Sequence, residues 1–75
     1  MYKILLIDDE KLLCLSMQAK IDKALKGMEY ECQYVLTGEA AIQKSQALKP
    51  DVAIVDYCLP DMFGNEVVHH IREVS

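Results

Sequence analysis

The stretch KILLIDDE, residues 3–10, passes from four consecutive apolar residues directly into three acids, Asp8, Asp9 and Glu10. Its apolar part is rich in branched side chains. This predicts a strand over residues 2–7 that is buried on both faces, as in a parallel sheet. Three neighbouring carboxylates at the end of such a strand repel one another. Their grouping therefore calls for either a bound cation or a local structural role.

The rest of the chain alternates between strand-like and helix-like segments. The predicted strands cover residues 2–7, 30–36 and 51–57, and the predicted helices cover residues 10–26, 39–48 and 65–74. Alternation of this kind is typical of βαβ units, whose strands are parallel and whose crossovers are right-handed. We therefore predict an α/β fold with a flavodoxin-like, doubly wound parallel sheet in the strand order 2-1-3.

Apolar periodicity predicts which face of each helix packs inward. The residues expected to face the sheet are Leu13, Met17, Ile21, Ala24 and Leu25 in the first helix, Ala41, Ile42, Ser45 and Leu48 in the second, and Val67, Val68 and Ile71 in the third. The adjacent His69 and His70 point about 100° apart on a helix, so they chelate poorly together and are expected to be solvated.

The predicted strand order brings distant acids together. Ligands of an open parallel sheet bind outside the carboxyl ends of the strands, where the strand order reverses. The first and third strands flank that point, so Asp8 and Asp9 should meet Asp56 in one crevice. Mg²⁺ prefers such oxygen ligands. The alternative is that Asp8 and Glu10 only cap the first helix, which leaves Asp56 unexplained.

An aspartate in such a cluster can also act as a nucleophile, because aspartate carboxylates form acyl-phosphates in some phosphoryl-transfer proteins. Asp56 is the better candidate, since it projects from a rigid strand end into the middle of the cluster. Asp8 and Asp9 would then hold the metal that neutralises charge on the phosphoryl group.

Composition limits the classes of function open to the chain. Lysine and arginine total 8 against 12 acids, and the basic residues do not cluster, so this segment is not expected to bind nucleic acid. The longest apolar run is too short to span a membrane. Cys14, Cys32 and Cys58 match no zinc spacing, and no signal peptide precedes them. We therefore expect reduced thiols and a cytoplasmic location.

Three segments, in order and at their spacing, resemble the receiver domain of bacterial response regulators in two-component signalling. They are ILLIDDE at the end of the first strand, TGEAAI at the second helix and KPDVAIVDYCLPDMFGNEVVHHIR around Asp56. The resemblance covers essentially the whole chain. It implies that Asp56 accepts a phosphoryl group from the phosphohistidine of a sensor histidine kinase and so switches an output.

The resemblance also implies a magnesium site around the phosphoacceptor. Asp9 would bind Mg²⁺ directly and Asp8 largely through water, and Asp56 and the backbone carbonyl of Cys58 would complete the protein ligands. The implied function is a phospho-accepting signalling domain and not an enzyme, with at most a weak self-phosphatase activity in the intact domain.

The chain departs from this family in two respects. Phe63 stands where the family more often has aspartate or another small polar residue, which changes the surface of that loop. The family has five strand–helix units, and residues 1–75 supply three. The serine or threonine that ends the family's fourth strand and the lysine that ends its fifth therefore lie outside this sequence. The resemblance implies a truncated receiver whose phosphorylation is impaired.

A three-unit sheet also predicts self-association. The edge of the third strand, residues 51–56, is apolar and lacks a fourth strand, so we expect a homo-oligomer formed by edge pairing or by exchange of elements. One alternative function is therefore an interaction or dimerisation module that works without phosphorylation. Another is a hydrolase with an aspartate nucleophile after the first strand, but such enzymes usually place a second aspartate where this chain has Glu10.

Overall fold

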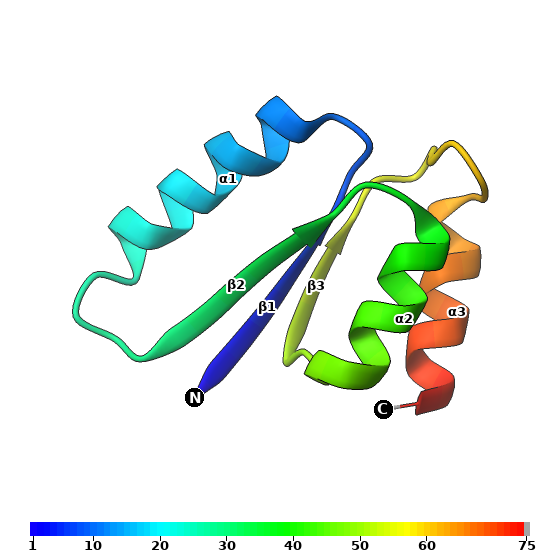
Figure 1. Cartoon of the computed structure of the whole chain (residues 1–75). Coiled ribbons are helices and arrows are strands. Elements are labelled where there is room, and N and C mark those ends of the chain that lie inside the picture. Colours follow the sequence, from blue (N-terminus) through cyan, green and yellow to red (C-terminus); the bar gives the residue numbers. More distant parts are fainter. Residues whose placement is uncertain (75) are drawn as a thin grey trace.

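The computed structural model describes the backbone of residues 1–74 and the side chains of residues 1–72. Strands and helices alternate along the chain as the sequence predicts (Figure 1). The elements are β1 (Tyr2–Ile7), α1 (Lys11–Ala24), β2 (Tyr30–Val35), α2 (Gly38–Leu48), β3 (Val52–Val55) and α3 (Gly64–Val74).

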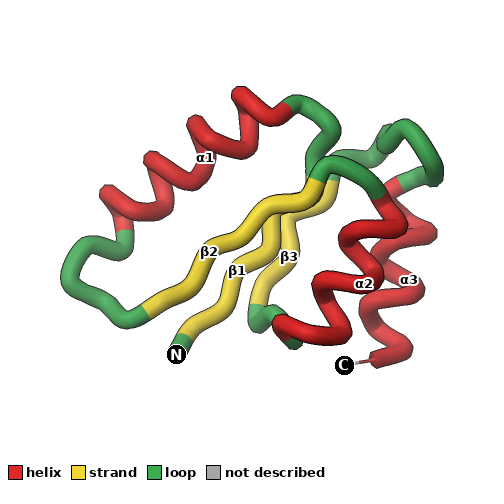
Figure 2. Tube along the Cα trace, in the orientation of Figure 1, coloured by secondary structure: helices red, strands yellow, loops and turns green. Residues whose placement is uncertain are grey.

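The three strands form one parallel sheet in the order β2-β1-β3, which confirms the predicted topology (Figure 2). Leu6 of β1 lies opposite Tyr34 of β2 on one side and Ile54 of β3 on the other. Because β1 is the central strand, its residues Ile4 to Ile7 are each at most 5% exposed. This explains why the opening strand reads as an unbroken apolar run.

The helices cover the two faces of the sheet unequally. Helices α2 and α3 lie together on one face, and α1 lies on the other (Figure 1). Side chains alternate between the faces along a strand, so Ile4 and Leu6 point away from Leu5 and Ile7. The larger core lies on the α2–α3 face and consists of Leu5, Ile7, Val35, Ala41, Leu48 and Val67.

The inward-facing position predicted from periodicity is wrong for three residues. Leu13 and Val68 are 48% and 38% exposed, and Ala24 is also exposed. Cys14 is buried in place of Leu13, whereas the predicted Met17 and Ile21 of α1 and its C-cap residue Leu25 are partly buried. This is a narrower stripe than the sequence predicts, because α1 packs mainly against β2, one edge of the sheet.

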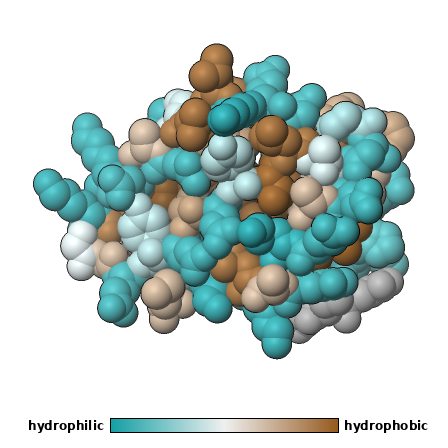
Figure 3. All heavy atoms as spheres, in the orientation of Figure 1, coloured by the Kyte–Doolittle hydropathy of each residue, from teal (hydrophilic) through white to brown (hydrophobic). Residues whose placement is uncertain are grey.

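Exposed apolar side chains are concentrated at the beginning of α1. Leu12 is 82% exposed and Leu15 is 42% exposed. Apolar atoms accordingly appear at the top of Figure 3, where Figure 1 places the start of this helix. Across the described residues, none of the helices combines the length and the apolar character that a membrane crossing requires.

Candidate functional site

Two neighbouring strands deliver acids to the same edge of the sheet. Ile7 of β1 lies opposite Val55 of β3, so the residues that follow, Asp8 and Asp56, leave the sheet side by side. The Asp56 N–H donates to the Ile7 carbonyl at 2.8 Å, and the Asp8 N–H donates to the Val35 carbonyl at 3.2 Å. These bonds hold the backbone of both acids at the strand ends.

The side chains of Asp8, Asp9 and Asp56 form a compact cluster. One carboxylate oxygen from each residue lies within 4.8 Å of the other two. Asp8 and Asp56 are partly buried, whereas Asp9 is exposed. The structure thus brings together the three acids that the sequence places at the ends of two separate strands.

Helix capping accounts for only one of the clustered carboxylates. Asp8 Oδ1 accepts a hydrogen bond from the Glu10 N–H at 3.0 Å, so Asp8 does support the entry into α1. Glu10 occupies the N-cap position, but within the described part of the chain its side chain makes no capping hydrogen bond. The capping alternative therefore explains part of the role of Asp8 and leaves Asp9 and Asp56 without one.

A groove of about 170 Å³ opens beside these acids. Its lining residues are Leu6, Ile7, Asp8, Met17, Ile54, Val55 and Asp56. Two carboxylates thus stand against otherwise apolar walls. An apolar wall excludes water from one side of a charge, which strengthens the attraction of a carboxylate for a cation.

Cys14 supports the cluster from α1. Its thiol donates a hydrogen bond to the Asp8 backbone carbonyl at 3.6 Å. Burial raises the pKa of the Cys14 thiol, and the nearby Asp8 and Asp9 carboxylates raise it further. The thiol is therefore held in its protonated, hydrogen-bonding form. Cys14 lies one helical step before Met17, but helical periodicity alone does not predict the hydrogen bond that its thiol makes.

The loop between β3 and α3 folds back onto Asp56. Cys58 and Phe63 pair in a single antiparallel bridge, and the Gly64 N–H donates to the Tyr57 carbonyl at 2.5 Å. The rings of Tyr57 and Phe63 lie 5.5 Å apart, and both are exposed. The loop is therefore closed at its base and presents an aromatic pair next to the acids.

Asp61 fastens this loop to α2. Its Oδ1 accepts from the Gly38 N–H at 2.8 Å and its Oδ2 accepts from the Glu39 N–H at 2.9 Å. In the sequence, Asp61 lies between the third predicted strand and the third predicted helix, and no pattern assigns it a partner. The sequence does show an acid in a turn, and it shows a helix that starts after Thr37 and whose first N–H groups need acceptors. It does not show that these two features pair with each other.

The model of the response regulator receiver domain family matches residues 4–75. The chain belongs to this family. The receiver domain is 31% identical over 71 residues to the alkaline phosphatase synthesis transcriptional regulatory protein PhoP of Bacillus subtilis. It is 34% identical over 71 residues to the transcriptional regulatory protein TrcR of Mycobacterium tuberculosis. Each match covers 95% of this chain, but only 28% of PhoP and 26% of TrcR.

The receiver domain is also similar to the chemotaxis protein CheY of Thermotoga maritima, at 28% identity over 73 residues. That match covers 97% of this chain and 58% of CheY. The chain thus spans about a quarter of the length of the two transcriptional regulators and just over half of CheY. Membership of this family makes the chain a signalling domain rather than a classical enzyme.

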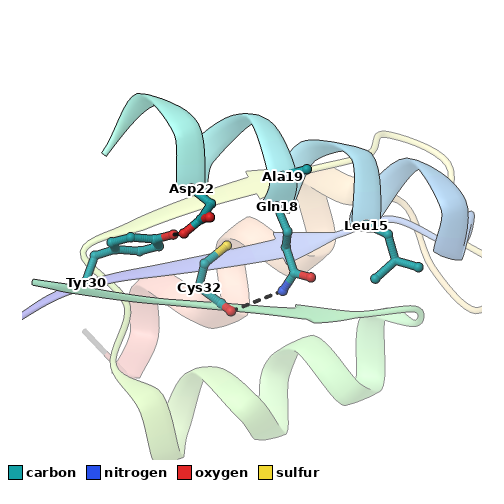
Figure 4. Close-up of a pocket in the computed structure, with 6 residues that line it drawn as sticks. All are labelled: Leu15, Gln18, Ala19, Asp22, Tyr30 and Cys32. Carbon is teal, nitrogen blue, oxygen red and sulfur yellow. Dashed lines mark hydrogen bonds between the residues drawn. The ribbon is translucent and has the colours of Figure 1, made fainter. Parts of the chain in front are cut away.

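A second groove of the receiver domain, of about 620 Å³, lies between α1 and β2 (Figure 4). It is lined by Leu15, Gln18, Ala19, Asp22, Tyr30 and Cys32. The Tyr30 hydroxyl donates to Asp22 Oδ1 at 2.5 Å, and Gln18 Nε2 donates to the Cys32 carbonyl at 3.1 Å. These bonds tie the helix to the edge strand, and none of the three clustered acids lines this groove.

Proposed function

We propose that this receiver domain accepts a phosphoryl group on the Asp56 carboxylate from the phosphohistidine of a sensor histidine kinase in the cytoplasm. The observation that carries the proposal is the convergence of Asp8, Asp9 and Asp56 oxygens within 4.8 Å of one another. They meet at the carboxyl edge of the sheet, where open parallel sheets bind their ligands. Phosphorylation there would bias the parent protein between two conformations and so switch its output.

The donor set fits Mg²⁺. One carboxylate oxygen from each of Asp8, Asp9 and Asp56 lies within 4.8 Å of the other two, and these are the hard oxygen ligands that Mg²⁺ would take. The proposed ligands are Asp8, Asp9, Asp56 and the backbone carbonyl of Cys58. Bound there, Mg²⁺ neutralises charge on the transferring phosphoryl group and on the carboxylates themselves.

Asp56 supplies the nucleophile of the proposed transfer. One of its carboxylate oxygens forms a bond to phosphorus while the bond from phosphorus to the kinase imidazole nitrogen breaks, and the imidazole leaves with that electron pair. The hydrogen bond from the Asp56 N–H to Ile7 holds the nucleophile at the end of β3. A fixed nucleophile needs little reorganisation to reach the in-line geometry of the transfer.

A phosphodonor assay tests this function directly. The chain is incubated with acetyl phosphate and Mg²⁺, and its intact mass is followed with time. We expect one phosphoryl adduct that disappears in Asp56→Asn and upon removal of Mg²⁺ by a chelator. The matched control is Asp51→Asn, which changes an exposed acid at the other end of the same strand. An adduct that survives in Asp56→Asn contradicts the assignment.

We further propose that these 75 residues form three of the family's five strand–helix units and on their own accept phosphate slowly. The resemblance assigns two charge-stabilising contacts, a serine or threonine and a lysine, to two further strands. The rate of adduct formation, compared with that of a five-unit receiver under the same conditions, measures the impairment. An equal rate contradicts it.

The open edge of β3 favours a second candidate function, an interaction module that works without phosphorylation. Within the described residues β3 pairs only with β1, and its residues Val52, Ala53 and Ile54 are exposed. An edge strand presents unpaired backbone N–H and C=O groups to any strand that fits them. We propose that a second copy of this chain pairs there, antiparallel about a twofold axis.

The oligomeric state tests the edge-pairing proposal. We expect the wild-type chain to sediment as a dimer at low micromolar concentration and Ile54→Lys to shift it toward monomer. Leu12→Lys is the control, because Leu12 is more exposed than Ile54 but lies on α1, away from the edge. A well-ordered wild-type monomer contradicts the proposal, as does equal dissociation of both variants.

A further inference from the structure

We propose that Asp61 is a positioning residue of the phosphoacceptor site, which holds the β3–α3 loop in place by clamping it to the start of α2. The inference rests on the function proposed for Asp56. It concerns a residue that touches neither the clustered acids nor any proposed metal ligand through a described hydrogen bond. Its role is to fix the backbone that follows Asp56.

The clamp supplies a helix start with acceptors from a distant part of the chain. The first N–H groups of a helix have no partner within the helix. In α2, the Gly38 and Glu39 N–H groups donate to the two Asp61 oxygens, from 23 and 22 positions away. The next group, the Ala40 N–H, donates locally to Thr37 Oγ1 at 3.1 Å. Two of these three hydrogen bonds at the start of α2, those accepted by Asp61, therefore also attach the β3–α3 loop to the helix.

The residue after Asp61 reinforces the attachment. A Cβ built on Gly38 would lie 2.3 Å from Met62 Cγ and 2.6 Å from Met62 Sδ, so the Met62 side chain occupies the space that any other residue at position 38 would fill. Met62 also packs against the core, together with Leu59. The charged and the apolar contact hold the same short segment against the same helix end.

Backbone contacts within the loop connect the segment around Asp61 to the residues that follow Asp56. The Leu59 N–H donates to the Met62 carbonyl at 3.1 Å, and Cys58, the proposed carbonyl ligand, bridges to Phe63. A tight, closed loop transmits a displacement at one end to the other, because its backbone hydrogen bonds leave few torsions free to absorb it. Loss of the Asp61 clamp would therefore move the carbonyl of Cys58 relative to Asp56.

Electrostatics support the clamp. Hydrogen bonds from the Gly38 and Glu39 N–H groups lower the pKa of the Asp61 carboxyl, so it is ionised at neutral pH. A negative charge at a helix N-terminus is favoured by the helix dipole. Charge-assisted hydrogen bonds of this kind are stronger than neutral ones, which suits a contact that carries a mechanical role.

Thr37→Ala is a matched control for Asp61→Ala. Both variants remove capping from the first turn of α2, but only Asp61→Ala cuts the link to the loop. We expect similar falls in melting temperature. Asp61→Ala should weaken Mg²⁺ binding, measured by titration calorimetry, about tenfold, as loss of an outer support does at metal sites. Thr37→Ala should leave Mg²⁺ affinity within about twofold, and Asp61→Asn, which keeps one acceptor, should lie between the two.

The exchange rates of the loop amides test the contact made by Asp61 without any need for Mg²⁺. We expect the Leu59 and Gly64 N–H groups to exchange faster in Asp61→Ala and to stay protected in Thr37→Ala. Equal Mg²⁺ affinities in the two alanine variants overturn the inference, and so do loop amides that exchange at the wild-type rate in Asp61→Ala. A wild-type chain that binds no Mg²⁺ overturns the proposed function instead, and the exchange rates then still decide whether Asp61 holds the loop.

Discussion

Gly64 rests directly on the backbone of Asp56. A Cβ built on Gly64 would lie 2.5 Å from the Asp56 carbonyl oxygen and 3.0 Å from Tyr57 Cα. The first residue of α3 is therefore packed against the peptide group that carries the proposed phosphoacceptor. Only glycine fits at this position, for reasons of space and not of backbone torsion.

Replacing Gly64 by alanine should disturb both stability and function. The added methyl group must push the Asp56 backbone away, and overpacking of this kind destabilises by about 1–3 kcal/mol. We expect a lower urea midpoint and slower adduct formation on Asp56. Gly27→Ala is the control, since Gly27 has φ +87° and open space around it. It should lose stability through backbone strain of about 1–2 kcal/mol without any effect on the phosphorylation rate.

Asp9→Asn should change stability in opposite directions with and without Mg²⁺. In chelator, removal of one of three clustered charges relieves repulsion and should stabilise the chain by up to about 1 kcal/mol. In Mg²⁺ at a hundred times the dissociation constant, the wild type gains about 2.7 kcal/mol, most of which the variant forgoes. Thermal melts under both conditions check this, and a variant that responds to Mg²⁺ as the wild type does contradicts it.

The Tyr30 phenol should titrate unusually high. Its hydrogen bond to the Asp22 carboxylate raises its pKa from 10.0 to about 12. A group whose pKa is higher in the folded state stabilises the fold fully below its unfolded pKa, and that contribution is lost as the pH rises toward 12. Phenolate absorbance during an alkaline titration measures the shift. Asp22→Asn should return the Tyr30 pKa toward 10, and an unchanged value would show that Asp22 is not the cause.

Ionised Asp61 should make the free energy of unfolding depend on pH in the acidic range. Its pKa is lower in the folded chain than its ordinary value of 3.8, so it stabilises the fold above that value and the contribution fades as the pH falls through the folded pKa. The stability difference between wild type and Asp61→Asn should therefore be largest at neutral pH and shrink in acid. Urea denaturation over a pH series tests this, with Glu39→Gln as the neighbouring-charge control. A constant difference across the series would argue against it.

The topology and the acid cluster could be predicted from the sequence because both depend on local signals. Apolar runs that end in acids mark the strand ends, and the parallel order then places Asp8 beside Asp56. The faces of the helices were harder to predict. Leu13 lies on an apolar stripe but is exposed, because α1 packs mainly against β2 and its helical period does not reveal how much of the sheet lies beneath it.

The Asp61 clamp could not be predicted, for a different reason. Asp61 and the start of α2 each have a local explanation. An acid after proline is typical of a turn, and Thr37 is by itself a sufficient N-cap. The pairing between them depends on how closely the loop approaches α2, and that approach is set by the packing of Met62 against Gly38. Contacts of this kind exist only once the core has formed.

The unequal covering of the sheet has a consequence for how the molecule opens. Helices α2 and α3 share a continuous core with all three strands, whereas α1 contacts mainly β2 (Figure 1). We expect α1 to peel away as a separate, less stable unit before the remainder unfolds. Asp9 lies in the connection to α1, so this partial opening would displace its carboxylate and remove the contact of Cys14 with Asp8. The backbones of Asp8 and Asp56 would stay at the strand ends, because both are hydrogen-bonded within the sheet.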